Sequence, residues 1–411
     1  MNNEQIQKYY DLILSVGVNI YKGQCVTINS GIKNEEFVYG LADAAYAKGA
    51  KYVDIIFNSH RLTKSRIEKS VDEEFLGYIP NFPIARSYEQ IANDWAYIRI
   101  DNLEEYDMMK NIDEHRYGFM IKKEQEMMKS MSRAVSSAKV PWCIVAVPGP
   151  NWAARVLNKE SSESTTNELS EKLVKVLRLD NDDPTAVWTS FGEKLLERAA
   201  KLTSMHLHKL HFDGPGTDLE IVLNENSLWK GGFTKAENGR RFIPNIPTEE
   251  VFTAPNFKLT NGRVAVTKPV KVMENLLTGI WFEFKDGKVI NSGADNNASL
   301  LEKFLDTDSG SRMLGEVALV DTDSEVHKSG LIFNSILYDE NAACHIALGR
   351  GITMCFKNSD ELLTPETMLA NGCNDSLVHT DFMIGSPEIS VMGFDKDGKE
   401  YPVIVKGKFA I

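Results

Sequence analysis

Strand-length apolar runs alternate with helix-length amphipathic segments through the first half of this 411-residue chain. Four such runs lie at residues 24–29, 52–57, 95–100 and 140–147, and each has the length of a buried strand. Strands that alternate with helices in this way form largely parallel sheets, because the helices make the crossover connections. The first half is therefore predicted to be an α/β domain with a mostly parallel sheet.

The second half has a different pattern, in which short strand-like runs are separated by turns that contain glycine and asparagine. Asn261-Gly262, for example, is a strong signal for a tight hairpin turn. This pattern favours a β-rich α+β domain. The change of pattern predicts two domains, an α/β domain over residues 1–205 and a β-rich domain over residues 206–411, and the length of the chain fits that number.

Charge and hydropathy exclude several classes of partner. The chain has 46 Lys and Arg against 58 Asp and Glu, a net charge of −12, which argues against binding nucleic-acid phosphates or anionic lipid through overall charge. It opens with MNNEQIQKYY rather than with a basic segment and then an apolar one, and no apolar run approaches the roughly 18 residues of a membrane span. We therefore expect a cytoplasmic protein with no nucleic-acid or membrane partner.

Several widespread catalytic motifs are absent from the sequence, which has no G-x-x-x-x-G-K-[ST] phosphate loop, no G-x-S-x-G and no H-E-x-x-H. The acidic and histidine side chains of the second half are therefore the candidate catalytic groups. The sharpest local pattern is His379-Thr380-Asp381. Residues two apart on a strand point to the same side, so His379 and Asp381 can bind one cation together. By itself the pattern is weak, and an ordinary surface strand explains it at least as well.

The segment LYDENAACHIALG places acidic groups and a histidine beside small residues. Glu340 and His345 are five positions apart, or about 140° around a helix, so they would not share a helix face. One of them is therefore expected at the end of an element or in a loop. Glu249-Glu250 and Glu316 are further acids at the edges of predicted elements, although a glutamate in such a place is usually a solvated surface residue.

Two alternative functions follow from other features of the chain. His206-Leu207-His208, with His211 close behind, could chelate a metal from a strand, which would suit a different metal-dependent amidohydrolase. A strand that links two domains explains the same histidines equally well. The second alternative is a two-lobed cytoplasmic binding protein without hydrolytic activity, which closes on a small ligand between its lobes.

Several long segments, found in the same order along essentially the whole chain, resemble the metal-dependent aminopeptidase family of aminopeptidases T and S and the lactic-acid-bacterial aminopeptidase PepS. The segments are VGVNIYKGQCVTIN, GTDLEIVL, NIPTEEVFTAP, SRMLGEVALV, LYDENAACHIALG and SLVHTDFMIGSPEISV. Their common order argues against an accidental match. The last three segments contain most of the acids and histidines that the local patterns identify.

The resemblance implies a metal site in the β-rich domain, with two divalent ions held by carboxylates and imidazoles. The ligands that it implies by position are Glu250, Glu316, Glu340, His345, His379 and Asp381. It places Glu316 between the ions as their bridge. Oxygen and nitrogen ligands suit Zn²⁺, Co²⁺, Mn²⁺ or Mg²⁺, so the ligand types do not select the metal.

The activity that the resemblance implies is hydrolysis of the N-terminal peptide bond of peptides with a free amino terminus. Two ions about 3.5–4 Å apart would lower the pKa of a water between them and polarise the scissile carbonyl. Glu249 or Glu340 would act as general base or bind the α-ammonium group of the substrate, so both join Glu316 as candidate catalytic residues. The resemblance further implies a homodimer.

One position departs from the family pattern. Family members usually have an active-site tyrosine seven residues after the histidine that corresponds to His345, which the resemblance treats as a helix residue, whereas this chain has Ile352 there. Either another group polarises the intermediate, or the local alignment shifts and Tyr338 substitutes for the missing phenol, or the activity is weaker than is usual for the family.

Overall fold

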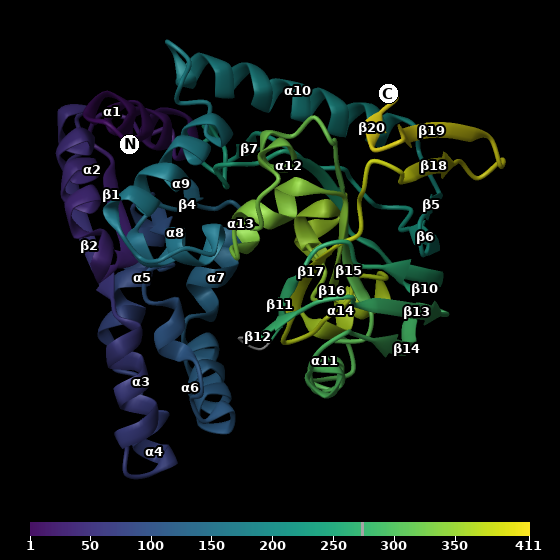
Figure 1. The fold of residues 1–411 in the computed structure, drawn as a ribbon, viewed down its shortest axis with the longest axis horizontal. Coiled ribbons are helices and arrows are strands. Elements are labelled where there is room, and N and C mark those ends of the chain that lie inside the picture. The colour runs from purple at the N-terminus through teal and green to yellow at the C-terminus, as the bar shows by residue number, and fades with distance from the viewer. Residues whose placement is uncertain (273–274) are drawn as a thin grey trace. The chain divides into compact units, whose positions relative to one another are not determined.

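The computed structural model describes residues 1–272 and 275–411, without the side chains at positions 114, 129, 133 and 136. These residues form two compact units that interleave along the chain (Figure 1). Unit 1 comprises Met1–Ser190 and Phe233–Ile246, and unit 2 comprises Phe191–Gly232 and Pro247–Ile411. The chain therefore crosses between units three times, whereas the sequence pattern predicted a single boundary near residue 205.

Unit 1 is built around a four-stranded sheet in the order β2-β1-β3-β4, and every neighbouring pair is parallel. Its strands are β1 (Cys25–Gly31), β2 (Tyr52–Asn58), β3 (Ala96–Ile100) and β4 (Trp142–Val145). All four runs that the sequence singled out are strands of this sheet, so the predicted α/β architecture with a parallel sheet is confirmed. Val26, Ile28 and Ile98 are among its fully buried residues, as expected for strands covered by helices.

Helices connect the strands of the parallel sheet in unit 1, and further helices precede and follow these strands along the chain. They are α1 (Asn3–Leu12), the π-helix η1 (Ile13–Gly17), η2 (Ile32–Asn34), α2 (Glu35–Ala47), α3 (His60–Lys69), α4 (Glu73–Leu76), α5 (Phe82–Ala92), η3 (Tyr106–Met109), α6 (Glu114–Met127), α7 (Lys129–Ser136), α8 (Pro150–Leu157) and α9 (Glu163–Val176). Helix α10 (Pro184–Ser204) contains the first division between the units. The returning segment adds the hairpin of β7 (Thr234–Lys235) and β8 (Arg241–Phe242).

Unit 2 contains a large antiparallel sheet in the order β14-β13-β10-β6-β5-β18-β19-β20. Its strands are β5 (Lys209–Gly214), β6 (Thr217–Leu223), β10 (Pro255–Ala265), β13 (Trp281–Lys285), β14 (Lys288–Gly293), β18 (Ser390–Phe394), β19 (Glu400–Val405) and β20 (Lys408–Phe409). In β6, buried residues alternate with more exposed ones. This alternation is typical of an antiparallel sheet with one face on the core and one toward solvent.

A smaller antiparallel sheet of unit 2 has the order β17-β16-β15-β9. Its strands are β9 (Glu250–Thr253), β15 (Leu314–Val320), β16 (His345–Gly349) and β17 (His379–Met383), and a separate hairpin consists of β11 (Val270–Val272) and β12 (Asn275–Leu277). The helices of this unit are α11 (Ala298–Leu305), α12 (Glu325–Ser329), α13 (Ile336–Asp339), η4 (Glu340–Ala342), η5 (Thr353–Cys355), η6 (Ser359–Glu361) and α14 (Pro365–Ala370). The predicted β-rich second region is therefore confirmed.

One hydrophobic core joins the two sheets of unit 2. Phe282 of β13 and Phe382 of β17 meet edge to face, with ring centroids 4.9 Å apart, and the ring centroid of Phe304 of α11 lies 6.1 Å from that of Phe382. The residues of the small sheet that belong to this core are Val251, Leu314, Val317, Leu319, Ile346, Leu348, Phe382 and Met383. The small sheet thus turns one face to the core, and its other face is available for polar residues.

Candidate metal centre

The register of the small sheet places five predicted ligands on the face opposite the core. In an antiparallel pair, directly opposed residues point to the same side of the sheet. The opposed pairs on this face are Glu250 with Val320, His345 with Ala318 on one side and Met383 on the other, Glu316 with Ala347, Asp381 with Ala347, and His379 with Gly349. Alanine or glycine therefore faces four of the five side chains, which leaves room for them to converge.

A β-bulge directs Glu316 to this face. The register between β15 and β16 shifts between Leu314 and Glu316, so Leu314 points into the core while Glu316, two residues later, points away from it. Gly315 at the bulge has no room for a side chain, because a Cβ there would lie 2.2 Å from the carbonyl oxygen of Arg350. Glu316 lies inside a strand rather than at the edge of an element, which corrects the sequence interpretation.

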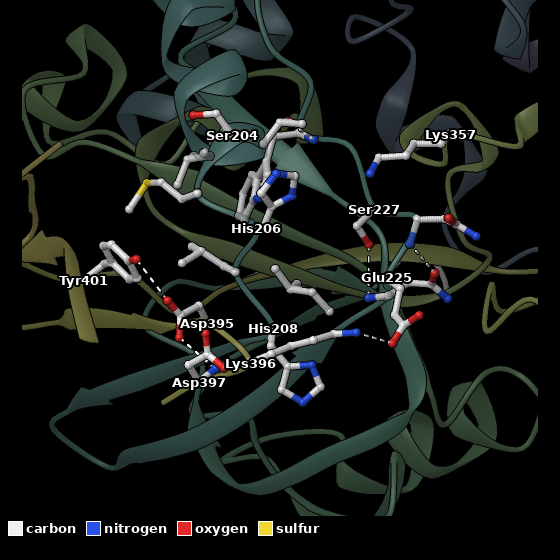
Figure 2. A pocket seen from close by; sticks show the side chains of 18 residues that line it. Ser204, His206, His208, Glu225, Ser227, Lys357, Asp395, Lys396, Asp397 and Tyr401 are labelled. Atoms are coloured by element: carbon white, nitrogen blue, oxygen red, sulfur yellow. Dashed lines mark hydrogen bonds and ion pairs between the residues drawn. The ribbon is translucent and has the colours of Figure 1, made fainter. Parts of the chain in front are cut away.

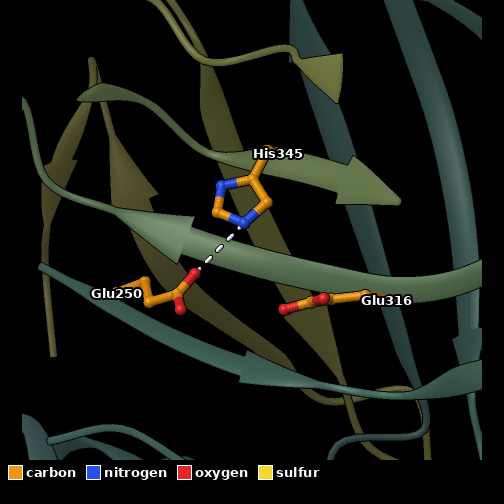
Figure 3. A group of neighbouring side chains, drawn as sticks. All are labelled: Glu250, Glu316 and His345. Carbon is orange, nitrogen blue, oxygen red and sulfur yellow. Dashed lines mark ion pairs between the residues drawn. The ribbon is translucent and has the colours of Figure 1, made fainter. Parts of the chain in front are cut away.

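Two groups of side chains in this sheet have the geometry to hold a metal ion. Glu250, Glu316 and His345 form one group, shown in Figure 3, and Glu316, His379 and Asp381 form the other. Within each group one candidate ligand atom of every residue lies within 4.8 Å of the others. Glu316 is common to both groups. The strand position predicted for His379 and Asp381 is also confirmed, since both lie on β17.

Both histidines are oriented for metal binding through Nε2. The Nδ1 atom of His345 lies 3.1 Å from the carbonyl oxygen of Ala343, and that of His379 lies 2.7 Å from the carbonyl oxygen of Arg350. A backbone carbonyl accepts a hydrogen bond, so it fixes the proton on Nδ1 and leaves the lone pair of Nε2 for a ligand. The Nε2 atoms face carboxylates, 3.1 Å from Glu250 and 3.2 Å from Glu316.

His345 is a strand residue, which corrects the expectation of a helix histidine. It is the first residue of β16 and is fully buried, while Glu340 begins the short turn η4. The separation of these two residues into different elements agrees with the expectation that one of them lies at an element end or in a loop.

The electrostatics of the cluster favour the binding of a cation. Burial raises the pKa of Glu316, and the charges of Glu250 and Asp381 raise it further. Burial also raises the pKa of Glu340 well above its usual range, and the same two carboxylates add to that effect. Glu316 is only 5% exposed. Carboxylates gathered in a buried place repel one another, and a divalent cation relieves that repulsion.

The same negative charge raises the pKa of both histidines. Burial alone lowers the pKa of His345, but its bond to Glu250 and the nearby carboxylate charges outweigh burial and raise the pKa to about 10. For His379, the bond to Glu316 and the charge of Asp381 overcome burial and raise the pKa to about 9. Oxygen and imidazole donors, fixed histidine tautomers and excess negative charge together fit a site for divalent metal.

Of the two other predicted site residues, Glu340 lies beside this face, whereas the charge of Glu249 acts on Arg198. The charges of Glu250, Asp381, His345 and Glu316 all act on Glu340, which places its carboxylate beside the cluster. Glu249 is buried, and its backbone N–H donates to the side-chain oxygen of Asn341 at 2.6 Å. The groups identified among the described residues include neither of these two acids.

Among the rival histidines, His211 belongs to the large sheet, whereas His206 and His208 precede strand β5. His211 on β5 pairs with Asp218 on β6 at 2.8 Å. Figure 2 shows His206 and His208 in a polar cleft of about 820 Å³, which Asp395 also lines. The potential metal groups found in the described part of the chain contain none of these histidines. The three histidines therefore give no support to an alternative metal site.

The missing tyrosine directs attention to two positions, Ile352 and Tyr338. Both side chains pack against neighbouring residues. Ile352 is partly buried against a small core cluster that contains Cys355 and Phe356. Tyr338 is fully buried, and its ring centroid lies 4.8 Å from that of Phe333.

Sequence reasoning missed two residues that shape the site. Gly315 makes the bulge, and Asn341 bonds to the segment that carries Glu249 and Glu250. Both lie inside segments that were singled out for other residues. A glycine before a candidate ligand and an asparagine after one are the signals that could have identified them.

Comparison with known proteins decides the family. A family model described as "Thermophilic metalloprotease (M29)" matches residues 2–409. The chain belongs to this M29 family of metalloaminopeptidases. The resemblance inferred from the sequence is thereby confirmed, and the alternative of a binding protein without enzymatic activity is wrong.

Named relatives cover almost the whole chain. Aminopeptidase 2 of Geobacillus stearothermophilus is 36% identical over 409 residues, which are 99% of this chain and 98% of that protein. Aminopeptidase T of Thermus aquaticus is 34% identical over 411 residues, 99% of each chain. A solved structure of wild-type AmpT from Thermus thermophilus matches with a TM-score of 0.91 and 33% identity, covering 99% of both chains. Among the described residues of this M29 member, no helix is long and apolar enough to cross a membrane.

Proposed function

We propose that this M29 metalloaminopeptidase binds two divalent ions on the face of the small sheet that is turned away from the core, and hydrolyses the N-terminal bond of peptides. The observation that carries the proposal is that both ligand groups share Glu316. Glu250 and His345 would complete one ion site, and His379 and Asp381 the other. A carboxylate with two oxygens can belong to both sites at once, so Glu316 is the proposed bridge.

The protein's own residues would set the reaction geometry. Divalent ions held here supply polarisation of the scissile carbonyl and a lower pKa for attacking water. Glu340 is proposed to accept and return the proton, because it lies beside the ligands while belonging to neither group. The resemblance also offers Glu340 as a ligand and Glu249 as an alternative base, and the metal content of Glu340→Gln distinguishes a ligand from a base at position 340.

Peptides with a free amino terminus are the proposed substrates. A carboxylate that binds no ion would bind the cationic α-ammonium group next to the reacting bond, and the net charge of −12 does not oppose that group. Acetylation removes that charge and leaves the group that bound it unpaired. The metal could be Zn²⁺, Co²⁺, Mn²⁺ or Mg²⁺, since the donors suit all four. A cytoplasmic homodimer stays a prediction.

Elemental analysis and a panel of aminoacyl chromogenic substrates test the proposal together. Purified protein is expected to contain two ions per chain, to lose activity when a chelator removes them, and to regain it when one of the four metals is restored. Glu340→Gln should keep two ions and lose turnover. Loss of an ion from that variant would make Glu340 a ligand instead.

A matched pair of peptides tests the substrate class. We expect release of single residues from a free peptide and no cleavage of its N-acetylated form. The pair differs only at the α-amine, so it isolates the contribution of the ammonium charge. Similar rates for both peptides, with cuts inside the chain, would refute the aminopeptidase assignment and leave only a dimetal hydrolase.

A further inference from the structure

Asn341 joins two segments that carry candidate catalytic acids. It is 0% exposed and follows Glu340 directly in the turn η4. Its side-chain oxygen accepts the backbone N–H of Glu249 at 2.6 Å. Its side-chain nitrogen donates to the carbonyl oxygen of Leu337 at 2.9 Å and lies 3.5 Å from the carbonyl oxygen of Pro247. One amide therefore ties together the segments around residues 249 and 340.

A second set of contacts holds the turn from the other side. Ser324, the N-cap residue of α12, donates its hydroxyl to the carbonyl oxygen of Asn341 at 2.6 Å. His327 of α12 places Nδ1 2.9 Å from the carbonyl oxygen of Ala342. These two contacts hold the main chain of the turn in place, and the side chain of Asn341 links the turn to the backbone of Glu249. Glu250, the adjacent residue, begins β9 and contributes to the first ligand group.

We propose that Asn341 is a positioning residue, which holds Glu250 and Glu340 in register for metal binding and catalysis. The inference rests on the proposed dimetal site. It requires an amide, because one side chain must accept from a backbone N–H and donate to a backbone carbonyl at the same time. An aspartate keeps only the acceptor when ionised, and an alanine keeps neither.

Metal affinity of the metal-stripped protein is the decisive measurement. Asn341→Ala is expected to bind the metal about 10–100-fold more weakly than the native chain, measured by competition with a chelator, as is typical when residues that orient ligands are removed. Val264→Ala is the control for general loss of stability. Val264 is 0% exposed in β10 of the large sheet, and its removal should lower the melting temperature while changing metal affinity less than twofold.

The metal affinities of these variants decide the proposal. Weaker metal binding in Asn341→Ala alone supports it, whereas native affinity in a folded Asn341→Ala protein overturns it. Equal weakening in Val264→Ala also overturns it, because the effect would then reflect stability. If Asn341→Ala does not fold, Ser324→Ala replaces it, and a severalfold weaker affinity supports the proposal while unchanged affinity overturns it. A native chain that binds no divalent metal refutes the proposed function itself.

A double-mutant cycle tests the link to Glu340 through turnover. If Asn341 acts by placing Glu340, Asn341→Ala should lower kcat in the native background and add little in a Glu340→Gln background. A purely structural asparagine would lower kcat by the same factor in both backgrounds, which contradicts the proposal. Full activity of Glu340→Gln alone would instead refute the proposed role of Glu340.

Discussion

The two sheets of unit 2 contain the same kinds of polar residue in opposite settings. In the large sheet, the side chains of His211 and Asp218 form a pair that is 32% and 82% exposed. In the small sheet, every residue of β15 and β16 is buried, including Glu316 and His345. A surface pair keeps its hydration and costs the fold little. Buried carboxylates lose hydration, so they persist only where a partner compensates them.

The burial of the acids separates candidate site residues from ordinary surface residues more sharply than residue type does. Both sheets have histidines and acids on neighbouring strands, and both present them at strand spacing. Only the small sheet combines buried carboxylates that repel one another with histidine tautomers fixed by backbone carbonyls. The proposed metal site would explain these costs, and substitutions in both sheets test whether the small sheet alone provides it.

Glu316→Gln is expected to have the largest effect, a loss of at least about a hundredfold in kcat. The amide keeps the shape of the side chain but removes the charge from the one position that both groups share. Glu249→Gln is the matched control, because Glu249 is also buried but is absent from both groups among the described residues. Steady-state kinetics on one chromogenic substrate compare them. Equal kcat values for the two variants would show that the acids are wrongly assigned.

His379→Ala and Asp381→Ala should each lose metal while the fold survives. Both residues belong to the second ligand group on β17, so we expect two ions per chain to fall to one or none, with a large loss of activity. Elemental analysis gives the stoichiometry, and the melting temperature shows that the chain is folded. Two ions per chain with full turnover would remove both residues from the site.

Much of the fold could be predicted from the sequence, because strand-length runs are local signals. The runs at 52–57 and 95–100 correspond to β2 and β3 almost residue for residue. His379 and Asp381 were also identified from local spacing, since both lie on one face of one strand. The family ligands on other strands came only from the resemblance, because no local spacing connects Glu250 to Glu316.

What the sequence could not provide depends on contacts between distant segments. Glu316 points to the site because a bulge at Gly315 changes the register with β16, and a bulge depends on the partner strand. Asn341 matters because its amide meets Glu249, a residue 92 positions away. The local sequence also does not predict that residues 233–246 return to unit 1. That return depends on a distant contact, because Ile144 of β4 pairs with Asn245 of the returning segment.

Ile352→Tyr should have an intermediate effect, on stability rather than on catalysis. Ile352 packs against the cluster of Cys355 and Phe356, so a larger ring with a polar tip should cost roughly 1–3 kcal/mol. We expect a lower melting temperature and no gain in kcat. A severalfold rise in kcat at unchanged KM would contradict this, because it would mean that the phenol stabilises the transition state specifically.

His211→Ala should have the smallest effect, and it tests the other side of the comparison. The pair with Asp218 is exposed, and exposed pairs contribute about 0.2–1 kcal/mol at most. A loss of that size shifts the melting temperature by only a few degrees, roughly 2–4 °C per kcal/mol for a unit of about 200 residues. We expect metal content, kcat and KM to match the native chain within error. A His211→Ala variant that lost an ion would show that the large sheet supplies part of the site, and the burial of the acids in the small sheet would then no longer mark the whole site.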